Sequence, residues 1–189
     1  MRRRFFPLAL GFIFLLGSLP TSVFATQVLR TSVEQMAQRS DVILHAHVVG
    51  QRVEWKREKN RSLTLTTLEI IQPLKGKIGK SIVVYQVGGT LDGVTYKIPG
   101  AIKLAKGEEV VFFGVRFRDM IASYGMGLGK FVVSRRGKSA TVLPHYGDIE
   151  FVTRRADGRI QNDTRGPDSP QSLGTFLNRV KAAVKGSVR

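Results

Sequence analysis

The sequence has no cysteine, few aromatic residues and few acids. Without cysteine the chain can form no disulfide bond, and it has neither a thiol nucleophile nor a zinc site with cysteine ligands. Aromatic residues make up 8% of the chain, and tryptophan occurs once. Only 14 Asp and Glu oppose 30 Lys and Arg, which gives a formal net charge of +16. Such a surface attracts anionic partners such as phospholipid headgroups, lipopolysaccharide or nucleic acid.

The rest of the composition is typical of a chain that folds. Its 189 residues correspond to one ordinary domain, and 42% of them are hydrophobic. This apolar share excludes a wholly disordered chain. No period of roughly 20–50 residues recurs, which argues against a solenoid or a propeller.

The first 25 residues have the features of a cleaved export signal. Arg2, Arg3 and Arg4 form a positive start, and Phe5 to Leu16 is almost entirely apolar. Val23-Phe24-Ala25 places small residues where a signal peptidase reads them, so we predict cleavage after Ala25 and a secreted or periplasmic location. An uncleaved membrane anchor is the alternative, although the apolar run is shorter than the ~20 residues that a spanning helix needs.

Two segments have helical periodicity. In Thr31 to Arg39, Thr31 and Glu34 are spaced as a capping box, which predicts a short helix with Thr31 as its N-cap. Ser172 to Lys185 predicts an amphipathic helix, because Leu173, Phe176, Leu177, Val180 and Val184 fall on one side.

The remainder favours strands with a period of two. Strands are expected at 41–49 with an extension to residue 55, and at 63–71, 81–87, 94–98, 109–117, 120–124, 130–134, 141–143 and 149–153. In the first of them Val42, Leu44, Ala46 and Val48 share the face expected to form the core. The alternation in the second changes near Thr66-Thr67, which predicts a bulge, and Pro73 is expected to end that strand. Short strands between turns indicate a sandwich or a small barrel, and the long first hairpin favours the barrel.

Three segments carry a resemblance to known proteins. They are Asp41 to Val48 (DVILHAHV), Leu68 to Gly76 (LEIIQPLKG) and Lys106 to Phe113 (KGEEVVFF). Together they resemble a widespread family of exported bacterial proteins of uncharacterised function. More distantly, they are similar to the netrin-like domain of tissue inhibitors of metalloproteinases. The resemblance covers about residues 37–116.

The resemblance implies a fold and no activity. Netrin-like domains are five-stranded OB-type barrels, and their inhibitory device is an N-terminal cysteine that chelates the protease zinc. This sequence has no cysteine, so no inhibitory residue carries over. We therefore expect a mainly β, OB-like (netrin-like) small barrel at 26–155, after a signal peptide at 1–25. A loop at 156–171 and a C-terminal amphipathic helix and tail at 172–189 would follow.

The search for catalytic motifs is negative. The sequence has no His-Glu-x-x-His and no Gly-x-Ser-x-Gly. Gly125 to Lys130 looks like a phosphate loop, but Tyr124 and Phe131 stand where that motif requires Gly and Ser or Thr. We expect a hairpin or bulge there instead. No catalytic or cofactor-binding residue is predicted, and the chain is not expected to be an enzyme.

His45 and His47 are the best metal candidates. Residues two apart on a strand project from one face, as a metal site can require, but His145 is the only other imidazole in the sequence. The alternative is a pair of half-exposed histidines on the solvent face of a sheet, and no metal is predicted. Glu108 and Glu109 point to opposite faces of their strand and form no catalytic pair.

The positive charge is the strongest functional clue. Basic residues and the single tryptophan suggest a recognition surface, for which we name Trp55, Lys56, Arg57, Arg135 and Arg136. The leading hypothesis is an exported, non-enzymatic binding or interaction module that recognises a protein or an anionic envelope component. The alternatives are a protein that resembles a protease inhibitor and a protein that binds polyanions. Nucleic acid is a less favoured partner, because the aromatic share is small.

Overall fold

The computed structural model describes residues 26–56, 61–163 and 169–186. The expected export signal and Arg57 lie outside these residues and remain predictions. Within the described residues the chain is mainly β, with one short α-helix near its start and another near its end, as the sequence predicts.

The elements follow the expected order. The strands are β1 (Thr26–Leu29), β2 (Val42–Lys56), β3 (Arg61–Lys75), β4 (Ser81–Val87), β5 (Gly89–Leu91), β6 (Val94–Tyr96), β7 (Glu109–Phe117), β8 (Met120–Ser123), β9 (Lys130–Arg136), β10 (Ser139–Pro144), β11 (Ile149–Arg154), β12 (Ile160–Asn162) and β13 (Gln171–Ser172). The helices are α1 (Val33–Arg39), α2 (Leu173–Gly186) and the 3-10 helix η3 (Met126–Gly129). Sequence analysis did not predict β1, β5, β12 or β13.

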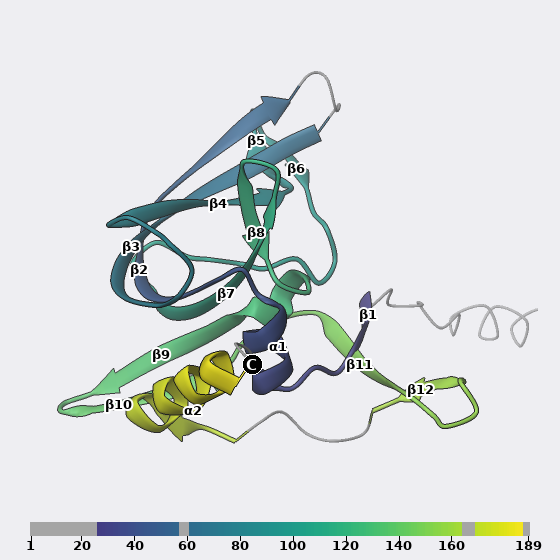
Figure 1. Ribbon diagram of the computed structural model, residues 1–189. Coiled ribbons are helices and arrows are strands. Elements are labelled where there is room, and N and C mark those ends of the chain that lie inside the picture. The colour runs from purple at the N-terminus through teal and green to yellow at the C-terminus, as the bar shows by residue number, and fades with distance from the viewer. Residues whose placement is uncertain (1–25, 57–60, 164–168, 187–189) are drawn as a thin grey trace, which may run out of the picture.

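Five strands are joined in a closed ring of pairings, in the upper half of Figure 1. β2 pairs with β3 on one side and with β7 on the other. β4 pairs with β3, and β8 links β4 to β7. The link between β4 and β8 is parallel and consists of the single pair Val84 and Ile121, so the ring is most open there.

Alternate side chains of the ring strands form the first core. The face predicted for β2 is confirmed, since its four apolar residues are almost completely buried. Ile102 and Leu104, from the connection between β6 and β7, complete this core. Its buried members are Val42, Leu44, Ala46, Val48, Leu68, Ile82, Val84, Ile102, Leu104, Val110, Phe112 and Ile121.

A second core covers the opposite face of β2 and β7. Ile43 and Val111 point into it, together with residues of both α-helices. Phe113, Phe131 and Phe176 form its centre, with ring centroids 4.8 to 6.4 Å apart. The first residues of β2 and most of β7 are therefore buried on both faces.

The two α-helices are tied together by an ion pair. Arg179 on α2 donates through Nε and Nη2 to the two carboxylate oxygens of Glu34 on α1. The hydrogen bond from Arg179 lowers the pKa of Glu34 to about 2. At the end of α1, the ammonium group of Lys75 donates to the carbonyls of Ala37 and Gln38, 2.9 and 2.8 Å away. These carbonyls lack helical partners, so the lysine both caps α1 and holds it against β3.

The predicted N-cap of α1 is wrong by one residue. Ser32, not Thr31, caps the helix: its hydroxyl accepts from Gln35 N, and the Gln35 side chain accepts from Ser32 N. Thr31 instead donates to the Leu29 carbonyl. Because Thr31 and Ser32 are both good N-caps, packing of Val33, Met36 and Ala37 against the second core decides between them.

The expectation that Pro73 ends the second long strand is also wrong. β3 continues to Lys75, and Pro73 pairs with Leu44 while Lys75 pairs with Ile43. Leu74 is the extra residue of a bulge, and a strand tolerates a proline such as Pro73 at a bulge because the ladder is interrupted there. The irregularity expected near Thr66-Thr67 lies opposite these residues on β2, where the register shifts between Val48 and Gly50.

The glycine-rich segment forms η3 rather than a hairpin. Gly125 has a φ of 53° and accepts from Leu128 N. A Cβ atom on Gly129 would lie 2.4 Å from the Phe113 carbonyl oxygen, so only glycine allows this approach to β7. The expected loop at 156–171 contains β12 and the first residue of β13, and β12 pairs with β11.

Candidate functional site

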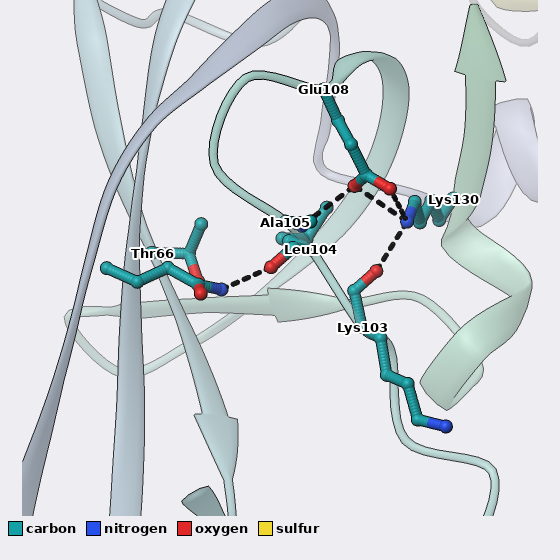
Figure 2. A network of polar contacts seen from close by, with 7 residues as sticks. Thr66, Lys103, Leu104, Ala105, Glu108 and Lys130 are labelled. Carbon is teal, nitrogen blue, oxygen red and sulfur yellow. Dashed lines mark hydrogen bonds and ion pairs between the residues drawn. The ribbon is translucent and has the colours of Figure 1, made fainter.

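The first polar cluster centres on Lys130, which is only 1% exposed. Its ammonium nitrogen lies 2.8 and 2.9 Å from the two carboxylate oxygens of Glu108 and also donates to the Lys103 carbonyl (Figure 2). The Ala105 N–H donates to the same carboxylate at 2.8 Å. A buried ammonium group is tolerated only with such partners. The cluster therefore fixes residues 103–108 across one end of the ring.

Gln51 attaches the same segment to β2 and β3. Its side-chain amide donates to the Leu104 carbonyl and, at 3.0 Å, to the hydroxyl of the buried Thr66. Figure 2 shows Thr66 and Leu104 on one side of Ala105 and Lys130 on the other. Residues 103–105 are thus held from both sides, which gives a rigid wall to the space beside them.

That space is the first of three neighbouring cavities. It has a volume of about 470 Å³ and lies between β2, β3, β5 and residues 103–104; we call it the mouth cavity. Gln51, Thr64, Thr90 and Lys103 line it. Gly89 allows the close approach of β5, because a Cβ atom there would lie 2.6 Å from Thr64 Oγ1.

Two further cavities adjoin the mouth cavity. The arginine cavity, of about 360 Å³, is lined by Arg61 together with residues of β4, β8 and the segment before Lys103, and it shares Gln86 with the mouth cavity. The tryptophan cavity, of about 480 Å³, is lined by Trp55, Ser62, Leu91, Asp92, Val94 and Tyr96. It shares Leu91 with the mouth cavity.

Among the described residues, cations outnumber carboxylates on the cavity walls. Asp92 is the only carboxylate among their described lining residues, and no imidazole lines any of them. The cationic residues there are Arg52, Arg61 and Lys103.

A second buried polar cluster joins β2, β7 and β9. Glu109 is 8% exposed and receives two hydrogen bonds of 2.6 Å from Arg135. His45 Nε2 lies 2.7 Å from Glu109 Oε1. The hydrogen bonds from Arg135 lower the pKa of Glu109 further than burial raises it. None of the three residues lines the three cavities, so the cluster stabilises the contact between these strands.

The structure places the candidate metal ligands in different surroundings. His45 is 4% exposed and bound to Glu109, so the expectation of two half-exposed histidines is wrong for His45, whose face is covered by the second core. His47 and His145 are exposed. Within the described residues, no three His, Asp or Glu side chains are grouped as a metal ion would require.

The described members of the predicted recognition set have different surroundings. Trp55 lines the tryptophan cavity, and Lys56 is paired with Glu54 at 3.0 Å. Arg135 is committed to Glu109, and Arg136 follows it, exposed, at the end of β9. Of the predicted recognition residues that the structure describes, Trp55 is therefore the one that lines a cavity.

Sequence reasoning missed three residues that shape this region. Lys130 and Gln51 are indistinguishable in the sequence from surface residues, because nothing local shows that the connection before β7 crosses over them. Arg61 lies in a basic segment that predicts a solvated hairpin tip, yet it reaches the arginine cavity. One signal that Lys130 is buried was available. Lys130 stands two residues before the apolar Val132, so both side chains lie on the same face of the strand.

Comparisons with known proteins add no family to this description. No protein-family model matches the chain, and no relative was found among curated protein sequences. Across the described residues, every helix is too short or too polar to cross a membrane.

The buried ion pair makes a prediction for stability. Lys130→Met should lower the free energy of unfolding by about 3 kcal/mol, because Glu108 loses its cation and the Lys103 carbonyl loses its donor. Urea unfolding monitored by circular dichroism measures the loss. The double variant Lys130→Met/Glu108→Gln should lose less than the single variants lose together, and simple additivity would contradict a direct coupling.

The Glu109 cluster makes a prediction for pH dependence. Because the folded pKa lies below the ordinary value of 4.5, the carboxylate stabilises the fold above that pH, and this stability is lost as the pH falls through the folded pKa. Glu109→Gln should therefore cost about 2 kcal/mol near pH 7 and progressively less below pH 4.5. Thermal unfolding from pH 7 to pH 3 measures this difference. Glu150→Gln, the same change at an exposed position, should cost little at any pH.

Proposed function

We propose that this chain is an exported, non-enzymatic binding module built on an OB-like barrel. Five strands joined in a ring with one weak parallel seam support the barrel, since OB folds are five-stranded and only partly closed. The bend of β2 near Gly50 lets one long strand take part both in the ring and in the hairpin that extends from it. Export rests on the features of residues 1–25.

The observation that carries binding is the grouping of the three cavities. All three are lined by residues of the segment 85–104 and by parts of β2 or β3. Their volumes lie within or near the range of roughly 300–1,000 Å³ that is typical of ligand sites. Their walls carry more cationic than anionic groups, which favours ligands with negative charge.

Site-directed photocrosslinking tests this proposal. A photoreactive phenylalanine at Val94, which is 72% exposed at the tryptophan cavity, should form adducts in envelope extracts. The same group at Ile160, 58% exposed on β12, is the matched control and should form few. Equal labelling at both positions, or none at Val94, would count against a ligand surface around the cavities.

A second candidate function, binding of polyanions, is favoured by the opposite end of the ring. Phe117 is 59% exposed at the turn between β7 and β8, with the Arg118 guanidinium 5.6 Å from its ring centroid. Arg116 donates to the Lys77 carbonyl, which brings a second and a third cationic residue to the same turn. Exposed aromatic rings among cations suit single-stranded nucleic acid and similar polyphosphates.

A salt titration with a single-stranded oligonucleotide tests this second function. Affinity should fall steeply as salt rises, because bound phosphates release counterions. The double variant Lys77→Gln/Arg118→Gln should flatten the plot of log affinity against log salt by about one to two. Arg154→Gln/Arg155→Gln removes the same charge elsewhere and serves as the control. Identical slopes in both variants would mean that only the overall charge matters.

A further inference from the structure

We infer that the arginine cavity binds a small amphipathic anion, with the anionic head on Arg61 and an apolar chain against the opposite wall. This inference rests on the proposed binding function and names the ligand class for one of its cavities.

Arg61 has a buried donor without an acceptor. Its Nε atom is shielded from solvent and makes no hydrogen bond, and no ion pair to its guanidinium is found in the described chain. A guanidinium group does not lose its proton in a protein, so the charge persists wherever the side chain is placed. The side chain as a whole is half-buried and lines the arginine cavity, so its other N–H groups are the donors available to an anion there.

The groups around Arg61 select an anion. None of the described residues that line the arginine cavity is a carboxylate, while Tyr85 and Ser123 add two hydroxyl groups. The only bond from the Ser123 hydroxyl is a long one of 3.4 Å to the Tyr124 carbonyl. The fork of N–H donors on a guanidinium matches the paired oxygens of a carboxylate or a phosphate. The head group is therefore an oxyanion of one of these two kinds.

The rest of the cavity wall is mostly apolar and favours a ligand with a hydrocarbon chain. Its apolar lining residues are Val87, Ile98, Ala101, Ile102, Ala122 and Met126. Ile102 also belongs to the first core. Inorganic anions alone would leave this surface in contact with water. A chain of several methylene groups would bury it, at about 0.8 kcal/mol for each methylene. The cavity thus combines one cation with an apolar wall, which fits a fatty acid or the monoester of a fatty alcohol with phosphate.

Isothermal titration calorimetry with four probes tests the ligand class. Decanoate and decyl phosphate represent the two head groups, decanol removes the charge, and inorganic phosphate removes the chain. We expect at least one of the two amphipathic anions to bind at least tenfold more tightly than decanol and phosphate, and the tighter one identifies the head group. Equal affinity for decanol, or no binding of either anion below its micellar concentration, would overturn the inference.

Variants test the role of Arg61 itself. Arg61→Gln should weaken binding of the preferred anion at least tenfold, and Arg61→Lys should fall between, because it keeps the charge and loses the fork. Arg154→Gln, which removes the same charge from β11, should bind like the wild type. Unchanged affinity in Arg61→Gln would overturn the assignment.

A spectroscopic readout keeps the test independent of variant folding. In the wild-type chain labelled with ¹⁵N-arginine, the Nε–Hε resonance of Arg61 should shift on titration with the anion, and no shift would contradict the inference. Crosslinking from Val94 reports on the proposed function separately. Crosslinking without anion binding would refute only the ligand class, whereas loss of both would refute the binding module as well.

Discussion

The pairing of β2 determines where this molecule is closed and where it is open. Along its first half β2 has β3 on one side and β7 on the other, so both of its faces are covered and both cores begin there. β7 begins at Glu109, opposite His47, and from Gly50 onward the pairings of β2 are with β3 alone. The outer half of β2 therefore has no second partner strand, whereas β3 continues to pair with β4 as far as Leu63. The inward side chains of this part of the hairpin, such as Gln51 and Thr64, are polar and covered by a connection rather than by another strand.

That connection accounts for the cavities. Residues 88–108 contain several glycines and only the short β5 and β6, so they cover the hairpin incompletely. Ile102 and Leu104 seal the apolar interior, and the contacts of Gln51 and Lys130 hold the chain between them in place. The cavities lie beside this fixed segment, and polar side chains line one side of them. An apolar core thus stays intact next to an accessible surface.

The charges fall into two groups with different roles. Many carboxylates are committed to the fold: Glu34 joins the α-helices, Glu108 holds Lys130 and Glu109 joins β2, β7 and β9. Because acids are scarce and several are used in this way, cations outnumber the acids that could pair with them on the surface of the described residues. The excess of cations in the part of the chain that the structure describes is therefore largely a property of its exterior. Arg61 differs from both groups, since it is neither paired nor fully hydrated.

The sequence alone determined most of the longer local elements, although not the short strands β1, β5, β12 and β13. The period of two in β2, β4 and β7 and the period of 3.6 in α2 depend on side-chain spacing, so they could be read without a fold. Three small errors, at Thr31, Pro73 and the glycine-rich segment, arose where neighbouring residues offered equivalent local solutions. Tertiary packing chose between those solutions.

Only the tertiary structure decided the candidate site. Lys130 and Glu108 are 22 residues apart, and His45 and Glu109 are 64 apart, so no local pattern could bring them together. The same holds for Arg61, whose cavity is built from β4, β8 and the connection before Lys103. A strand pattern shows which residues share a face, but not which distant segment covers that face. Burial, and with it the role of each charged side chain, depends on that covering.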